Sequence, residues 1–568
     1  MLAIFVSWII LAFVLLSFGD MLLTLSKKIC TQAGNYNLVD KFLAGLCLLI
    51  IPLSVWSLWM PSNHLFLLIG IAASLIYWSI YRKKVSDILS SIKHAVAGLA
   101  KIQILLLIAL GLFSIYLFSW EQEVYDSLMY HHQNIRWDEE FAVVPGLGNL
   151  DDKFGFNSNY FLLSSIFTFR FIFGEAIYPL QSFIVTAISG WILYEVFKSN
   201  YEIKRIIIFV SYLLLFWISI YFIGNTSTDV LPNFIVFYIL ARIVLYPESL
   251  KTNKVLYIIL PAFLLTCKLS FFPICIISLY LLYLIIKEKK YKEFTFLVGI
   301  CCLIVTPWLI RNVIISGYLV YPLYQIDLFS FDWKVPQEVA MKQKDYIFAI
   351  GYYFLRIALR YPDMSARDPL TINILTDIIY LLTIVSLASI TYYVIKRRHE
   401  VKDHIWLLYI VFLLSIFVWA TGGPDIRFIA GILCTAIFTG GILLFKSGRR
   451  PFIGKTVSFL FVIGIFTWSS YNLYYFNTQS NNSDTISHIA YKPYSVIDQK
   501  KTQGIDIEKD FAQYHLNNGV SILVNTGFSY DIFPSTIHSV YAKFLSIDCL
   551  EARGNTLQDG FRAKGGCK

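Results

Sequence analysis

Charged residues are scarce in this chain. They make up 15% of its 568 residues, whereas 57% of the residues are hydrophobic and the mean hydropathy is +0.63. No soluble chain of this length is expected to have such a composition, and runs of about 20 apolar residues, which recur here, are typical of transmembrane helices. The composition therefore excludes an ordinary soluble enzyme and predicts an all-α polytopic membrane protein.

Signals of several other classes are also missing. The first apolar run, Leu2 to Gly19, lacks the basic start and the cleavage site of a removable signal peptide, so we expect it to be a span. We find no phosphate-binding glycine loop and no convincing internal repeat, so cytosolic ATP is not expected to drive the protein. The net charge of +10 does not indicate nucleic acid, because the basic residues lie in short clusters between apolar runs.

The nine cysteines form no metal-binding pattern. Seven of them lie in or beside apolar runs, where a thiol is a small apolar filler. Cys549 and Cys567 lie in the C-terminal tail, and whether they pair in a disulfide stays open.

The basic clusters orient the chain. We expect about fourteen spanning helices, because this count puts every Lys and Arg cluster on the cytoplasmic side. The expected spans lie near 2–25, 40–60, 64–81, 102–120, 178–197, 205–223, 229–247, 255–271, 272–286, 294–312, 371–395, 404–420, 427–446 and 452–475. The apolar run 160–173 is too short to span and is expected to be an interfacial or re-entrant helix.

Three polar stretches then fall on the outer side. A multispan domain, 1–475, contains the outer loops 121–159 and 313–370, and residues 476–568 are expected to form a small extracytoplasmic α/β domain. In this tail we expect a helix near 506–517 and a buried strand at 520–525. Passive connections between helices need about two to eight residues, so the long, acidic loop 121–159 is the candidate functional region.

Within this loop, residues 125–140 lack Gly and Pro and have helical spacing, which predicts a short helix along the membrane surface. Asp126 at its start either caps this helix or acts chemically. Tyr130 and His131 follow about one turn later and are expected to share its face. Asp126, Glu123 and His131 are the candidates for proton transfer.

Three isolated cations contradict the rule that basic residues face the cytoplasm. Lys268, Arg311 and Arg427 all lie at expected outer ends of spans. Lys268 alone is also explained by snorkelling to the interface, but three such residues on one face indicate a bound anion. Asp229, near Lys268 on the same face, is either a helix cap or a second acid.

Carboxylates above a cavity rimmed by cations suit displacement at a sugar carbon with a lipid phosphate as the leaving group. The carboxylate takes the proton of the attacking hydroxyl, and Arg or Lys neutralises the departing phosphate. Nucleotide sugars are absent outside the cell, so the expected donor is a polyprenyl-phosphate-linked sugar in the bilayer.

Certain segments resemble the GT-C superfamily of integral-membrane glycosyltransferases. These segments are YDSLMYHHQNIRW in the first outer loop, PWLIRN and GYLVYPL in mid-chain, and GGPDIRF later. The resemblance implies a catalytic role for Asp126, with Glu123 and His131 beside it, and donor-phosphate binding by Lys268, Arg311 and Arg427. It departs from the family in one respect, because Asp126 is followed by Ser127 rather than a second acid.

The loop 121–159 is also similar to a group of uncharacterised bacterial multipass proteins that share D-x-x-x-Y-H, a later Trp, V-P-G-L-x-N-L and G-x-N-S. Together, these resemblances imply substrate binding by Tyr130, Asp229, Trp137 and Asn149, and a bacterial cytoplasmic membrane as the location.

The expected function is transfer of a sugar from the lipid-linked donor to a glycan, lipid or protein acceptor of the cell envelope. A transporter or flippase of lipid-linked glycans, and a polysaccharide polymerase or ligase, are the alternatives. No cofactor is indicated with confidence. A divalent metal held by His131, His132, Asp126 and Glu123 stays open, although adjacent histidines on a helix point about 100° apart.

Overall fold

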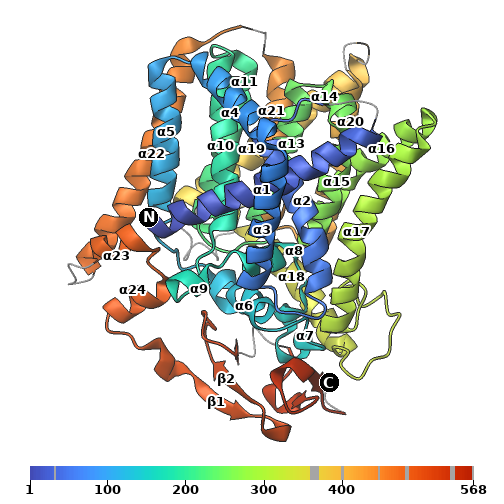
Figure 1. Cartoon of the computed structure of the whole chain (residues 1–568), viewed down its shortest axis with the longest axis vertical. Helices are drawn as coiled ribbons and strands as arrows, with labels where there is room; N and C mark the ends of the chain where they lie inside the picture. Colours follow the sequence, from blue (N-terminus) through green and yellow to red (C-terminus); the bar gives the residue numbers. More distant parts are fainter. Residues whose placement is uncertain are drawn as a thin grey trace.

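The structure is a computed structural model of the whole chain (Figure 1). It describes all residues except 31–33, 359–369, 398, 400–401, 446–447, 480–484, 538–543 and 566–568. Most of the described chain is helical, as expected from the composition. Among the described residues, eight helices are long and apolar enough to cross a membrane, or nine if one bent pair is counted as a single span.

The eight are α1 (Leu2–Ile29), α2 (Leu38–Trp56), α10 (Pro179–Lys198), α16 (Cys275–Lys287) with the preceding turn η3 (Leu269–Ile274), α17 (Tyr291–Ser316), α19 (Leu370–Lys396), α20 (Asp403–Gly422) and α22 (Pro451–Gln479). The bent pair is α3 (His64–Ile80) and α4 (Arg82–Ala97), which meet at 90°. Shorter helices of this part are α5 (Lys101–Leu117), α8 (Asn159–Ile166), α9 (Arg170–Phe173), α11 (Ile203–Ile218), α12 (Ile220–Ile223), α13 (Val230–Leu245), α14 (Ser249–Thr252), α15 (Lys254–Cys267) and α21 (Ala430–Leu444). Helix α18 (Gln337–Ala358) has 22 residues but is more polar than the eight.

Each apolar run expected to span the membrane forms a helix, but several of these helices are shorter than a full span. The runs 102–120, 229–247, 255–271 and 427–446 become helices of 10 to 17 residues. The run 160–173 is confirmed as too short, since it divides into α8 and α9, and α8 is buried. The apolar runs thus predicted where the helices lie. The turns that shorten some of these helices were not predicted from the sequence.

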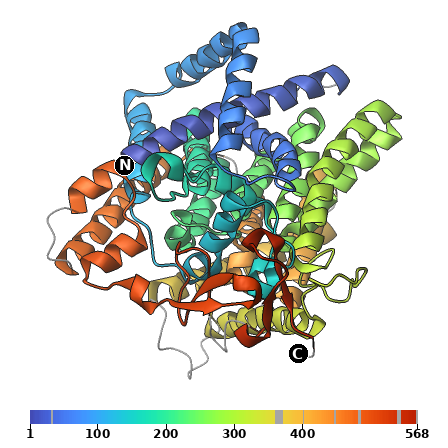
Figure 2. The ribbon, with the colours of Figure 1, turned by 60° about the horizontal axis from the view of Figure 1, so that its bottom comes forward.

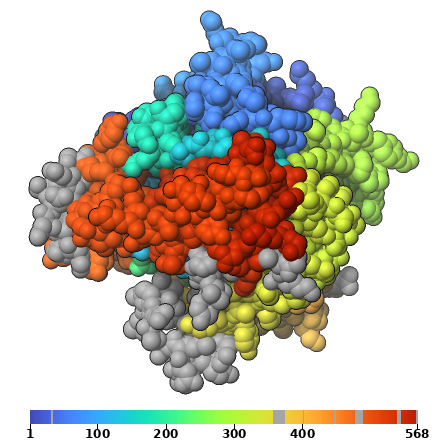
Figure 3. Space-filling model, turned by 90° about the horizontal axis from the view of Figure 1, so that it is seen from below, coloured from blue at the N-terminus to red at the C-terminus, as the bar shows by residue number. Residues whose placement is uncertain are grey.

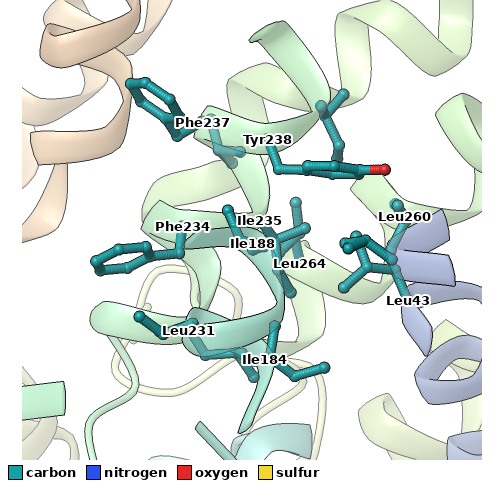
Figure 4. Packing of buried hydrophobic residues seen from close by; sticks show 14 of the residues in the cluster. Leu43, Ile184, Ile188, Leu231, Phe234, Ile235, Phe237, Tyr238, Leu260 and Leu264 are labelled. Atoms are coloured by element: carbon teal, nitrogen blue, oxygen red, sulfur yellow. The ribbon is translucent and has the colours of Figure 1, made fainter. Parts of the chain in front are cut away.

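Helix α13 lies at the centre of the bundle. It is apolar on all sides, as a helix surrounded by other helices is expected to be, and nearly every residue is buried. Figure 4 shows Leu231, Phe234 and Ile235 of α13 packing among side chains of α2, α10 and α15. Since lipid is as apolar as leucine, close packing rather than water exclusion holds such helices together.

The polar segments gather at one end of the bundle. Figure 1 shows α6 (His132–Glu140), α7 (Leu147–Leu150), α9 and the C-terminal strands at the lower end. Turned by 60°, the ribbon shows the C-terminal segment lying across this end (Figure 2), and the space-filling view from below shows it spread over the face (Figure 3). The loop 121–159 is therefore mostly buried between the bundle and the tail, rather than lying open at a surface.

The tail contains two short helices and two small sheets. The helices are α23 (Thr485–Tyr491) and α24 (Val496–Thr502), and the strands are β1 (Ala512–His515), β2 (Ser521–Asn525), β3 (Ser535–Ile537), β4 (Leu550–Ala552) and β5 (Phe561–Ala563). Strand β2 is central, antiparallel to β1 and parallel to β3, and β4 pairs with β5 in a second sheet. A strand is confirmed at 521–525, where Ile522 and Asn525 are buried and the other three residues are partly exposed.

The prediction of a helix near 506–517 is wrong. This segment forms one short turn, η7 (Ile507–Asp510), followed by β1. The exposed edge residues of β1 pair with β2, so tertiary pairing decides the conformation over local spacing. Cys549 is disulfide-bonded, and Cys567, the partner considered from the sequence, lies outside the described residues.

Candidate active site

Asp126 lies where the chain enters the buried loop. The residues after it form a π-helical turn, η1 (Ser127–His131), which continues into α6. Such turns are rare and are frequent at functional sites. Within the described chain, the Asp126 side chain makes no capping hydrogen bond to this helix, so the cap interpretation loses its support.

The loop before α13 fixes this turn in place. The hydroxyl of Ser127 donates to the carbonyl of Thr226 at 2.7 Å, and His131 Nδ1 lies 2.7 Å from the same oxygen. Because that oxygen can only accept, Nδ1 carries the proton and Nε2 has a free lone pair. Among the described residues, the buried Nε2 has no hydrogen-bond partner.

Arg427 holds the Asp126 carboxylate from the opposite side. Its Nη1 lies 3.1 Å from Asp126 Oδ2, and its Nε and Nη2 each lie 2.9 Å from Asp425 Oδ2. The short turn η6 (Ile426–Phe428) begins with the Asp425 side chain accepting from the Arg427 backbone N–H at 2.8 Å. The tight hairpin between α20 and α21 therefore presents the guanidinium to the loop 121–159.

Lys268 forms a second ion pair close by. It stands at the break between α15 and η3, in extended backbone, and its ammonium contacts the carboxylate of Asp229. The same ammonium lies 3.5 Å from the centre of the Phe428 ring. Asp229 precedes α13 but makes no capping hydrogen bond in the described chain, so its interpretation as a cap also loses support.

Asn233 joins these elements. Its amide donates to the carbonyls of Asp229 at 2.9 Å and of Arg427 at 2.6 Å, and its oxygen accepts from Gly431 N–H at 2.8 Å. It lines a small open pocket together with Asp229 and Arg427. The free volume of the pocket, about 20 Å³, has room for water but not for a sugar ring.

The charges at this place are set by their neighbours. Burial raises the pKa of Asp126, but Arg427 first, then His131 and Lys268, together outweigh it and hold that pKa below its ordinary value. Burial lowers the pKa of His131 to about 4. At neutral pH the site thus contains an ionised carboxylate beside a neutral imidazole, which are both bases.

The ring of Tyr130 lies 4.3 Å from that of His131. Six residues expected from the sequence are thus brought together here: Asp126, Tyr130, His131, Asp229, Lys268 and Arg427. The other four lie elsewhere. Glu123 is exposed and pairs with Lys500 of the tail at 2.8 Å. Arg311 is buried in a separate ion pair with Asp138 at 2.6 Å.

The remaining two have packing positions. Trp137 is in a core shared with the tail, where its ring meets Phe533 and Phe561. The Asn149 amide donates to the Trp333 carbonyl at 2.8 Å and lies fully buried. Both residues therefore bind the loop to neighbouring chain.

The sequence did not single out Asp425, Asn233 or Thr226. Asp425 stands two residues before Arg427 in GGPDIRF, and that spacing was the available signal. Nothing in the sequence marks the Thr226 carbonyl as the partner of His131, since it is a backbone group on a distant segment.

The metal site considered with His131, His132, Asp126 and Glu123 is not assembled. His131 faces Thr226, whereas His132 stacks on Tyr178 at 4.4 Å and lies 3.6 Å from Glu121. The two rings diverge, as expected for neighbours on a helix.

Comparison with known proteins gives one match. Residues 1–434 match a family described as Domain of unknown function (DUF8201). No curated protein and no solved structure matches the chain. The matched region includes Asp126, Asp229, Lys268 and Arg427, and ends before α22 and the tail.

Proposed function

We propose that this chain, which belongs to the family described as Domain of unknown function (DUF8201), is a GT-C-type membrane glycosyltransferase. Its donor is a sugar linked to polyprenyl phosphate, and its acceptor is a hydroxyl-bearing or amide-bearing component of the cell envelope. The finer topology belongs to the same proposal: about fourteen membrane-embedded helices, with the loop 121–159 and the tail on the extracytoplasmic face.

One observation supports the proposal above all others. An ionised carboxylate that caps no helix, Asp126, lies 3.1 Å from Arg427, which stands 301 residues later in the chain. A second cation, Lys268, stands beside the same hairpin through Phe428. A base next to paired cations is what transfer from a phosphate leaving group requires.

In the proposed reaction, Asp126 accepts the proton of the acceptor group as that group forms a bond to the sugar anomeric carbon. The bond from this carbon to the phosphate oxygen breaks, and polyprenyl phosphate leaves with the electron pair. Arg427 and Lys268 neutralise the charge that grows on the phosphate. His131 Nε2 serves as the second acceptor for the proton.

The small size of the pocket fits an exchange of ion pairs. Without donor, the carboxylates of Asp126, Asp229 and Asp425 satisfy the two cations. A donor phosphate replaces Asp126 as the partner of Arg427, which makes room for the sugar and frees the carboxylate to act as a base. Donor binding and activation of the base thereby become one event.

The first test replaces Asp126 with asparagine. D126N keeps the size of the side chain but removes the proton acceptor, so transfer should fall by about 10²- to 10⁴-fold. A strain that lacks the gene is complemented with wild type or D126N. Its lipid-linked and envelope-linked glycans are then compared by mass spectrometry, and prenyl-linked donor should accumulate with D126N.

The matched control is D506N, because Asp506 is an exposed aspartate of the tail that pairs with Lys509 at 3.3 Å. Both variants must be present in the membrane at wild-type amounts. Full complementation by D126N would remove the proposed base and leave a flippase of lipid-linked glycans as the better explanation.

A further inference from the structure

A second cluster of ionisable side chains lies away from the proposed active site. Glu175 comes from the turn between α9 and α10, and His488 and Asp498 come from α23 and α24 of the tail. One ligand atom of each lies within 4.8 Å of the others, and among the described residues no other group of three has this geometry. The N-terminus, α9, α23 and α24 meet in this part of the molecule (Figure 1).

The distances suit a shared ion. His488 Nε2 lies 3.4 Å from Asp498 Oδ2. Two ligand atoms that each lie about 2.0–2.2 Å from a zinc ion are about 3–3.6 Å apart, so this pair already has the required separation. Small side-chain movements bring the Glu175 carboxylate to the same place.

The cluster has bonding capacity that protein groups leave unused. His488 Nε2 is shielded from solvent and has no hydrogen-bond partner among the described residues. The Glu175 carboxylate is contacted by the ammonium of Lys492. A cation is therefore already drawn to the Glu175 carboxylate, while the nitrogen of His488 keeps its place for a ligand.

A further carboxylate stands next to the cluster. Glu121 lines the same small pocket as Glu175 and Ser495, and its Oε2 accepts from the Val496 N–H at 2.8 Å. Its Oε1 faces His132 Nε2 at 3.6 Å. Both oxygens of Glu121 thus face other groups, and a water molecule can complete a four-ligand shell around the ion.

We propose that Glu175, His488 and Asp498 bind a divalent transition-metal ion, zinc by preference, which fastens the tail to the membrane domain. An imidazole among carboxylates favours zinc over magnesium or calcium, which prefer shells made of oxygen. The site is structural: it joins α23 and α24 to the turn before α10, and Asp126 takes no part in it. This inference does not rest on the proposed function.

The test measures metal directly. The full chain is purified in detergent with an affinity tag that contains no histidine, treated with a chelator and returned to buffer. Zinc is then titrated in competition with a chromophoric chelator, and bound metal is measured by mass spectrometry. Wild type should take up zinc in a ratio of about one per chain, and the affinity of H488A should fall by at least about tenfold.

H515A is the matched control, because His515 is an exposed histidine of the same tail whose Nδ1 bonds Ser521 at 2.8 Å. It should bind zinc as wild type does. If H488A is not monodisperse, E175Q is used instead, since it keeps the side-chain shape and removes the charge. Its zinc affinity should also fall by at least about tenfold. Equal zinc affinity in H488A (or E175Q) and H515A, no uptake by wild type, or displacement of zinc by equimolar magnesium or calcium would overturn the proposal.

Discussion

Two arginines that look alike in the sequence have different surroundings in the structure. Arg427 and its partner Asp126 keep 28% and 31% of their side-chain surface exposed beside a pocket. Arg311 keeps 2%, and besides Asp138 it donates to the Ser57 hydroxyl at 2.7 Å and to the Asn157 side chain at 3.3 Å.

The difference in exposure indicates that the Arg311 pair stabilises the fold, whereas the Arg427 pair is accessible to a substrate. The Arg311 pair fastens α17 to the end of α2 and to α6, and no ligand can reach it without unfolding that junction. The Arg427 pair can exchange its partner, because solvent and a pocket adjoin it. An arginine at the end of an apolar helix therefore predicts an ion pair, and only the accessibility of that pair tells whether a substrate can compete for the arginine.

Loss of Arg311 should have the largest effect, and it should act on folding. R311M leaves the Asp138 carboxylate buried without its ion partner, which costs about 3–5 kcal/mol. The melting temperature in detergent and the amount of protein in the membrane should both fall sharply. R311M/D138L removes both charges and should recover part of the lost melting temperature. An unchanged melting temperature in R311M would show that this ion pair does not stabilise the fold.

Loss of Arg427 should act on transfer instead. R427M should lower the glycan product by about 10²- to 10³-fold, the cost of removing one group that stabilises growing negative charge. It is made together with D425N, because R427M alone would leave the buried Asp425 carboxylate without its partner. The melting temperature of this double variant should fall less than that of R311M, because the Asp126 side chain is 31% exposed. R427K keeps the charge without the fork of donors and should lie in between. If the melting temperature fell as far as is expected for R311M, both arginines would be structural and Arg427 would have no separate role in transfer.

His131 should give an intermediate effect that depends on pH. Its pKa is about 4 in the folded chain and about 6.5 when unfolded, so the unfolded chain binds a proton first as pH falls. Stability contributed by the neutral imidazole is complete above pH 6.5 and is lost between pH 6.5 and 4, by up to roughly 3 kcal/mol.

H131N tests this without losing the local contact, because an asparagine amide can donate to the Thr226 carbonyl in place of Nδ1. Melting temperatures are measured from pH 7.5 to pH 4.5 for both proteins. The drop should be smaller in H131N than in wild type, and parallel curves would show that His131 does not govern acid sensitivity.

The sequence was informative about elements and much less so about their partners. Apolar runs located the helices, and three misplaced cations pointed to Lys268 and Arg427, because burying a charge in a membrane protein requires a reason. The same logic could not set Arg311 apart, since its partners Ser57, Asp138 and Asn157 come from three other segments. Which residues are buried, and which pair across several hundred positions, is decided by tertiary packing. The pattern of apolar residues in the sequence does not specify these partners.

Loss of Glu123 should have the smallest effect on both activity and stability. Its carboxylate is 46% exposed and pairs with Lys500, and exposed pairs of this kind contribute about 0–1 kcal/mol. E123Q should leave the glycan product within about twofold of wild type and the melting temperature nearly unchanged. The measurement is the same complementation assay as for D126N, so the two acids are compared in one background. Because Glu123 is three residues from Asp126, a strong loss in E123Q with full activity in D126N would move the base to the side of the loop that faces the tail, and Arg427 would then hold a structural carboxylate just as Arg311 does.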